Sequence, residues 1–183
     1  MFWNRLRKME PGAQVLGAAL CVVLLGAGCG SRTTDSGNAS SEGFELDVAH
    51  CGGFGPADAA AILGVPAEKL QDHSRDLSEN SRWCLLENPD DSKKGVTFTV
   101  SRADSVDEAA VEFQQFRQHA SMAATMGGSP EEKIHEIPDL GDEAVWSPVP
   151  GGVYIRQGRY SVQVNQPADE ETQIEIARKI LGK

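Results

Sequence analysis

The spacing of apolar residues predicts one small domain of mixed helices and strands. Strands are indicated where apolar and polar residues alternate, as Val96, Phe98 and Val100 alternate with two threonines. Helices are indicated where apolar residues recur every three or four positions after a capping residue. In chain order the pattern predicts a helix after Gly55, strands over 81–87 and 96–100, a long helix over 105–127, a short strand over 133–137, a hairpin over 153–164 and a helix from Asp169.

The hairpin near the end of the chain has a register that can be tested by its pattern. A two-residue turn at Gln157-Gly158 would pair Ile155 with Tyr160 and Val153 with Val162, and would put the apolar residues on one face. The opposite face would then carry Tyr154, Arg156 and Arg159. An aromatic ring beside two cations is a composition enriched at interfaces, so these three residues are a candidate interaction face. A solvated face with ordinary cross-strand neighbours is the alternative.

The order of elements predicts the fold class. A tryptophan precedes each of two strand pairs, Trp83 in one and Trp146 in the other, and a helix follows each pair. This order suggests two related strand–strand–helix halves. We expect an α+β fold in which an antiparallel β-sheet has its helices packed on one face and its other face partly open.

The first residues have the pattern of an export signal. Three basic residues within the first eight precede an apolar run over 15–27, which is shorter than the roughly 20 residues that span a bilayer. The sequence Leu25-Gly26-Ala27-Gly28-Cys29 resembles a bacterial lipobox, in which the cysteine takes a diacylglycerol and becomes the new N-terminus. Two acyl chains are enough for stable attachment to a membrane. An ordinary cleaved signal with an incidental cysteine is the alternative.

These features predict three parts of the chain. Residues 1–28 are expected to be a lipoprotein signal peptide, and residues 29–48 to be the lipidated Cys29 with a flexible tether. The tether is expected because residues 30–43 are rich in Gly, Ser and Thr and have no large apolar side chain. Residues 49–183 are expected to form the single α+β domain.

Charge and composition exclude several classes of function. The chain has 183 residues, 40% of them hydrophobic, and a net charge of -10. Removal of residues 1–28 would leave 14 basic and 26 acidic residues. Nucleic acid is not an expected partner, because binding to phosphates needs a surplus of Lys and Arg. An anionic lipid surface would repel the domain, so the lipid anchor would be its contact with the membrane.

The cysteines indicate an oxidising compartment. Cys21 would be removed with the signal and Cys29 would be lipidated, so Cys51 and Cys84 remain as one pair in an exported chain. A structural disulfide is the expected role of this pair. Neither cysteine has a second Cys or His at the spacing of a zinc site.

No motif predicts a catalytic, metal or cofactor site. Asp139, Asp142 and Glu143 form a compact acidic group that is a candidate Ca²⁺ site, but no EF-hand spacing surrounds them, so a solvated turn with Gly141 at positive φ is favoured. The four histidines are scattered, and neither GxSxG nor a phosphate-binding glycine motif occurs. We therefore expect no metal and no cofactor.

Several short motifs together resemble a known family. They are Cys51 followed by the alanine-rich segment 56–64, the pair Trp83-Cys84, and Leu140-Gly141-Asp142-Glu143-Ala144 before a hairpin and a final helix. In these motifs the chain resembles the actinobacterial secreted lipoproteins of the domain-of-unknown-function 3558 family, and more distantly the extracellular sensor domains of mycobacterial receptor kinases. The resemblance implies a lipid-anchored extracytoplasmic domain with Cys51 bridged to Cys84, and it implies no reaction.

The expected function is therefore binding. We expect a lipid-anchored binding or sensor-like accessory module without catalytic activity, held on the extracytoplasmic face of the cell membrane. Its partner would be an envelope protein, a wall component or a small ligand. A carrier of a lipid or small hydrophobic ligand is the alternative. The small side chains Ala109, Ala110, Ala120 and Ala123 on the long helix leave room for a cavity, although they equally permit close packing. A hydrolase whose site has no recognisable motif is a third hypothesis.

Overall fold

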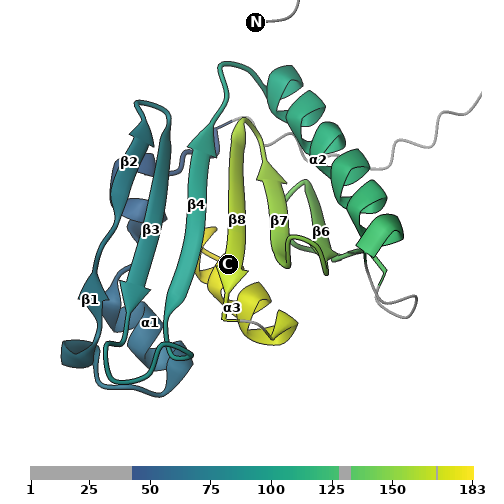
Figure 1. Ribbon diagram of the computed structural model, residues 1–183. Coiled ribbons are helices and arrows are strands. Elements are labelled where there is room, and N and C mark those ends of the chain that lie inside the picture. The colour runs from purple at the N-terminus through teal and green to yellow at the C-terminus, as the bar shows by residue number, and fades with distance from the viewer. Residues whose placement is uncertain (1–42, 128–132, 168) are drawn as a thin grey trace, which may run out of the picture. The chain divides into compact units, whose positions relative to one another are not determined.

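The computed structural model describes residues 43–127, 133–167 and 169–183, and within them an eight-stranded antiparallel sheet (Figure 1). The strands follow the order β1-β3-β4-β8-β7-β6-β5, and β2 pairs with β3 beside this path. Their bounds are β1 (Gln71–Asp72), β2 (Arg75–Ser78), β3 (Ser81–Glu87), β4 (Val96–Arg102), β5 (His135–Glu136), β6 (Glu143–Ser147), β7 (Gly152–Gln157) and β8 (Tyr160–Gln166). The α+β class and the antiparallel sheet are confirmed.

One face of the sheet carries the main core, and we call it the core face. Cross-strand pairs place Cys84 opposite Phe98, Phe98 opposite Val164, and Val164 opposite Val153 on this face. All four side chains are buried. The alternation predicted for β4 and for the hairpin strands produces this row, because side chains two residues apart point to the same side of a strand.

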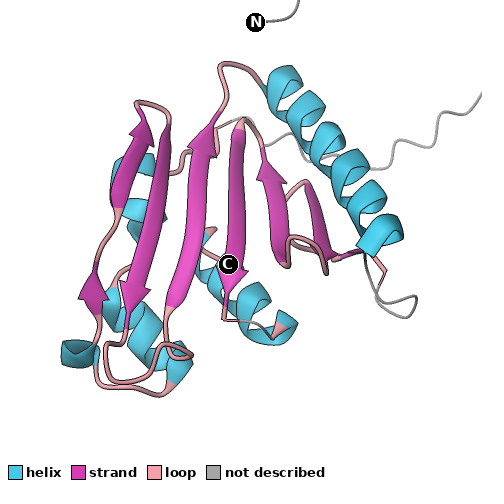
Figure 2. Ribbon diagram, viewed as in Figure 1, coloured by secondary structure: helices cyan, strands magenta, loops and turns pink. Residues whose placement is uncertain are grey.

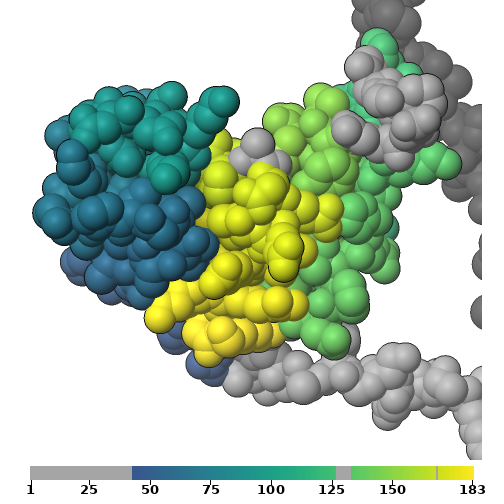
Figure 3. Space-filling model, turned by 90° about the horizontal axis from the view of Figure 1, so that it is seen from below, coloured from purple at the N-terminus to yellow at the C-terminus, as the bar shows by residue number. Residues whose placement is uncertain are grey.

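Two α-helices and a 3₁₀ helix cover the core face. They are α1 (Pro56–Leu63), α3 (Glu170–Ile180) and η1 (Val48–Gly53), while a second 3₁₀ helix, η2 (Ala67–Lys69), follows α1. α3 buries Ile176, Ala177 and Ile180 against β7 and β8. Seen from below, α3 lies between the N-terminal part of the domain and the strands β6 and β7 (Figure 3). Asp169 accepts a hydrogen bond from the Thr172 N–H, so α3 begins where its sequence predicted.

The long helix α2 (Val106–Gly127) lies on the opposite face, which we call the outer face (Figure 2). Its Phe116 ring stacks on Tyr154 of β7, and its Arg117 pairs with Glu136 of β5. Both partners alternate with core-face residues along their strands. The expectation that all helices share one face therefore does not hold for α2.

The placement of α2 also bears on the suggested repeat. β4 and β8 lie side by side at the centre of the sheet, with β3 and β7 outside them, so the two hairpins are arranged symmetrically. A two-fold axis perpendicular to the sheet would exchange the two hairpins. Such a rotation leaves each face of the sheet on its own side, so equivalent helices would lie on the same face. Because α2 and α3 pack on opposite faces, the helices do not follow the symmetry of the hairpins.

The register of the β7–β8 hairpin differs from the predicted one. Ile155 pairs with Val162 and Gln157 with Tyr160, so the turn residues are Gly158 and Arg159. Gly158 has a φ of 60°, which suits a glycine in the turn. The apolar pattern does not distinguish the two registers, because each leaves the same side chains on the same face.

The packed domain begins before residue 49. Leu46 is buried in the core, and Phe44 meets Tyr160 edge to face with ring centroids 5.8 Å apart. The Tyr160 hydroxyl donates to the carboxylate of Glu45. Residues 43–48, expected to be the end of the tether, therefore belong to the fold, because Phe44 and Leu46 supply it with apolar surface.

The predicted disulfide is present. Cys51 of η1 and Cys84 of β3 are joined, with their Cα atoms 6.0 Å apart, and both residues are buried. Cys51 takes the left-handed conformation with a φ of 55°. The bond fastens the segment before α1 to the core face of the sheet.

Candidate functional site

α2 covers the part of the outer face formed by β6, β7 and β8. Phe116 and Tyr154 stack with ring centroids 3.3 Å apart and planes 10° from parallel. Ala109, Phe113 and Ala120 are buried along the same helix, and Val145 is buried on β6. Figure 1 shows β3 and β4 with no helix in front of them on this face. This second apolar cluster holds α2 over one half of the sheet.

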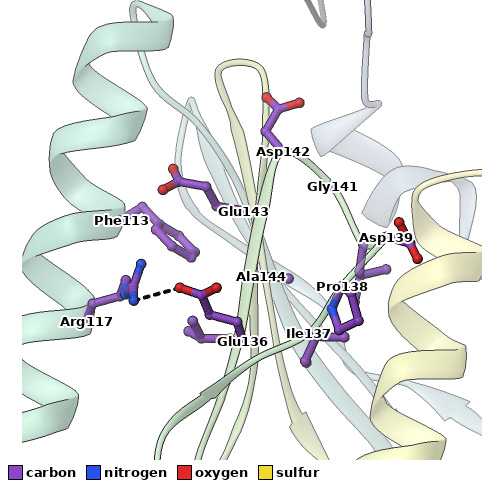
Figure 4. Close-up of a pocket in the computed structure, with 12 residues that line it drawn as sticks. Phe113, Arg117, Glu136, Ile137, Pro138, Asp139, Gly141, Asp142, Glu143 and Ala144 are labelled. Carbon is purple, nitrogen blue, oxygen red and sulfur yellow. Dashed lines mark hydrogen bonds and ion pairs between the residues drawn. The ribbon is translucent and has the colours of Figure 1, made fainter. Parts of the chain in front are cut away.

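A cleft opens where α2 meets β5, β6 and the loop between them, and we call it the α2 cleft (Figure 4). Its volume is about 600 Å³. The helix contributes Phe113 and Arg117, and the segment 136–145 contributes all the other lining residues. The apolar lining side chains are buried apart from Pro138, so the cleft presents chiefly carboxylates and a guanidinium to its interior.

Two charged side chains from different elements meet across the cleft. Arg117 Nη2 donates to Glu136 Oε1 at 3.0 Å, and the two side chains are 36% and 75% exposed. Nearby, Gln114 Nε2 of α2 donates to Glu143 Oε1 of β6 at 3.0 Å. Figure 4 shows the carboxylates of Glu136 and Glu143 on the α2 side of the strands, with the Phe113 ring near them. Exposed pairs of this kind contribute little stability, so these contacts can be exchanged.

A buried arginine holds the other side of the cleft wall. Arg156 Nε donates to Glu143 Oε2 at 2.7 Å, and its Nη1 donates to Asp142 Oδ2 at 3.1 Å. The same Asp142 oxygen accepts the Gly158 N–H at 2.7 Å. Only 11% of the Arg156 side chain is exposed. The cluster therefore fixes the β7–β8 turn to the start of β6, and its charges satisfy one another inside the protein.

The loop before β6 has an unusual backbone that shapes the cleft. Asp139 has a φ of 61° and Gly141 a φ of 74°. A Cβ atom at Gly141 would lie 2.6 Å from the Arg156 carbonyl oxygen and 2.6 Å from Ile155 Cγ2. The positive φ expected at Gly141 is confirmed. Because glycine has no Cβ atom, the loop can pack closely against β7 at this position.

The candidate interaction face is not assembled as the sequence predicted. Tyr154 lies beneath Phe116, and its burial raises the pKa of its phenol to about 12. Arg156 is bound to Asp142 and Glu143. Arg159, in the turn, donates to Glu45 of the N-terminal segment at 3.3 Å. The three side chains therefore do not form the open face that the sequence predicted, because α2 covers Tyr154 and carboxylates bind the two arginines.

The acidic group is also divided. Asp142 and Glu143 share Arg156, whereas the Asp139 carboxylate points away from Glu143 (Figure 4). Among the residues described, no three His, Cys, Asp or Glu side chains are placed to hold a metal ion.

One histidine contacts two elements. His135 of β5 stacks on Trp146, with ring centroids 5.4 Å apart, and its Nε2 lies 2.8 Å from Glu170 Oε1 of α3. The hydrogen bond to Glu170 raises the pKa of His135 above its usual value. This pair lies on the core face, away from the α2 cleft.

Sequence reasoning missed Arg117 and Glu136 as site residues. Arg117 follows Phe113 by four positions, so it flanks the buried stripe of α2 at a helical spacing that the sequence does show. Its partner could not be identified, because Glu136 lies on a two-residue edge strand with no pattern of its own.

Residues 1–42, and with them the predicted signal, Cys29 and most of the tether, lie outside the described residues. No helix in the described part of the chain is long and apolar enough to cross a membrane. Comparisons with protein-family models, with curated proteins and with solved structures gave no match. The resemblance to the domain-of-unknown-function 3558 lipoproteins stays a prediction.

Proposed function

We propose that this protein is a lipid-anchored, non-catalytic binding module on the extracytoplasmic face of the cell membrane, and that it holds a partner or a small polar ligand in the α2 cleft. Membership of the domain-of-unknown-function 3558 family is part of the same proposal. The family resemblance provides the expected location of the protein, and the α2 cleft is its proposed binding site.

The observation that carries the proposal is the composition of the α2 cleft. Its lining combines the apolar side chains of Phe113 and Pro138 with the charged side chains of Arg117 and Glu136. Sites that bind ligands join apolar surface with a few placed polar groups in this way. The described lining offers carboxylates and a guanidinium, which bind through charge and hydrogen bonds. This composition supports binding.

The disulfide supports the compartment. Bridged cysteines persist in exported proteins and are rare in the reducing cytosol. The joined Cys51 and Cys84 therefore agree with the signal and the lipid anchor predicted from the first 29 residues.

The small side chains of α2 do not favour a lipid carrier. Ala109 and Ala120 are buried and let the helix approach the outer face closely. On the other side of the sheet, the side chains of α3 that face it are buried as well. Close packing, the other role that the alanines allow, is what these contacts support.

A photo-crosslinking amino acid placed at Asp139, which lines the cleft and is exposed, tests the proposal in the full chain within its own envelope. The matched control places it at Val111, exposed on α2. We expect an adduct, of protein or small-molecule mass, at position 139 and not at 111. Equal labelling at both positions, or none at 139, would contradict binding in the cleft.

The anchor is tested separately. Cys29→Ala in the full chain should move the protein from the membrane fraction to the soluble fraction and remove the diacylglycerol from its intact mass. Retention in the membrane would show that another segment holds it there.

A further inference from the structure

We propose that the α2 cleft selects a cationic group, an ammonium or guanidinium, and that Arg117 is a built-in competitor that occupies this position until the ligand displaces it. The inference rests on the proposed binding function and adds the chemical class of the ligand.

The acidic groups of the cleft differ in how firmly their partners are held. Glu143 Oε2 and Asp142 bind the buried guanidinium of Arg156. By contrast, Glu136 Oε1 and Glu143 Oε1 accept from the exposed side chains of Arg117 and Gln114, both on α2. Two carboxylate oxygens on the α2 side of the strands are therefore served by donors that can move aside.

A cation has the properties needed to replace those donors. An ammonium brings three N–H groups and a guanidinium five, so either can donate to carboxylates such as those of Glu136 and Glu143. The exposed ring of Pro138, which lines the cleft, can pack against the methylene stem of a lysine or arginine side chain. An anionic group would reach Arg117 only beside Glu136, Asp142 and Glu143, and like charges disfavour that approach.

The charge of the whole protein favours the same ligand. With a net charge of -10, the molecule attracts cations over a distance that salt limits. That attraction is not specific to the cleft. Mutation of Arg117 distinguishes the cleft from this general attraction. Removal of a competing side chain should raise the affinity for the cation, whereas removal of a carboxylate that binds the cation should lower it.

The test measures the affinity of the detergent-solubilised full chain for a fluorescently labelled tetralysine peptide by anisotropy. Arg117→Gln should tighten binding about two- to fivefold, and Glu136→Gln should weaken it by a similar factor, as expected for one exposed ion pair. Lys94→Gln and Glu171→Gln make the same changes of net charge at exposed positions outside the cleft lining, and they should leave the affinity unchanged.

Two further probes identify the source of the cation. Displacement of the peptide by spermidine but not by a monomeric lysine derivative would indicate a free polyamine. Displacement by the lysine derivative but not by spermidine would indicate a basic segment of a partner protein. A tetraglutamate peptide should not bind. Tighter binding of tetraglutamate than of tetralysine, or equal effects of Arg117→Gln and Lys94→Gln, would overturn the inference.

The two proposals can fail separately. A crosslinked partner that contacts position 139 without a basic group would overturn the ligand class and leave binding in the cleft intact. No cleft-specific adduct in the envelope would contradict the proposed function itself, whatever the peptides do in solution.

Discussion

Arg156 shows how a single residue can be correctly placed on a strand and wrongly placed in its surroundings. Alternation assigns it to the outer face, and it does lie there, opposite Glu143 in the strand pairing. Its guanidinium is nevertheless buried, because Asp142 and Glu143 neutralise it and α2 packs nearby. A cation is retained in such a position only with carboxylate partners, so Arg156 is a structural residue of the cleft wall.

Gly141→Ala tests the loop that forms the cleft. The added Cβ meets the Arg156 carbonyl and Ile155 at 2.6 Å, and the φ of 74° strains any side chain, so we expect a loss of about 2–4 kcal/mol in the free energy of unfolding. Chemical denaturation measures it.

Gly64→Ala is the matched control. Its φ is 63°, but no atom lies within 4 Å of the added Cβ, so only backbone strain of about 1 kcal/mol is expected. Equal losses in the two variants would show that the close contact at Gly141 costs nothing.

At the scale of elements, α2 and α3 are held by different means. α3 packs into the main core through Ile176, Ala177 and Ile180. α2 rests on a smaller cluster, which includes Phe113 and Phe116 and does not join that core. A helix with less buried surface opens more readily, so α2 is the element whose position a ligand in the cleft can influence most easily.

Phe116→Ala tests this difference. Loss of the half-buried ring that stacks on Tyr154 should cost about 2 kcal/mol. Hydrogen exchange should become faster in α2 by more than the loss of global stability explains. The amides of α3 should change only by the amount that the loss of global stability accounts for. A uniform change along the chain would contradict separate attachment.

The contact between β5 and α3 should depend on pH. The hydrogen bond that His135 Nε2 donates to Glu170 raises the pKa of His135, so protonation favours the folded state. This contribution is present below the unfolded pKa of about 6.5 and is lost as the pH rises through the raised folded value. We expect the wild type to exceed His135→Gln in the free energy of unfolding by more at about pH 6 than at about pH 8.

Solvent exposure limits the size of that effect. The His135 side chain is 49% exposed, so the difference should stay below about 1 kcal/mol. Glu170→Gln should remove the same pH dependence. A persistent dependence in Glu170→Gln would assign it to another group.

For the whole molecule, the disulfide joins parts that are distant in the chain. It links η1, which precedes α1, to β3, across 33 positions of sequence. Nearby, Gly52 lies against Leu46 and Ile180, so a side chain there would meet the end of α3. The N-terminal segment, the sheet and α3 are therefore fastened at one place.

Replacement of both Cys51 and Cys84 by alanine should lower the free energy of unfolding by about 3–4 kcal/mol, because the unfolded chain loses its closed loop. Urea titration with and without reductant checks the cause. The wild type should lose stability when reduced, and the double variant should not respond. A response of the double variant would indicate a different reductant-sensitive group.

The predictions from sequence held where local physics decides the outcome. β3 occupies 81–87 as predicted, and the Glu108 N–H donates to the Ser105 hydroxyl at the predicted start of α2. β1 and β2 were missed because their residues are exposed and show no apolar alternation. The hairpin register was wrong because its turn is fixed by Asp142, a partner 16 residues before Gly158 in the sequence.

The sequence alone determined the α+β class, the core rows of β4 and β8, and the pairing of the two cysteines, since periodicity and residue type are local properties. Only the tertiary structure decided which face α2 covers. Both faces of the sheet offer apolar surface, so the sequence pattern of α2 does not decide between them. The helix lies on the outer face because Phe116 packs on Tyr154 there and not in the core beside α3. The α2 cleft exists because of this choice: it lies between elements whose contact no local pattern encodes.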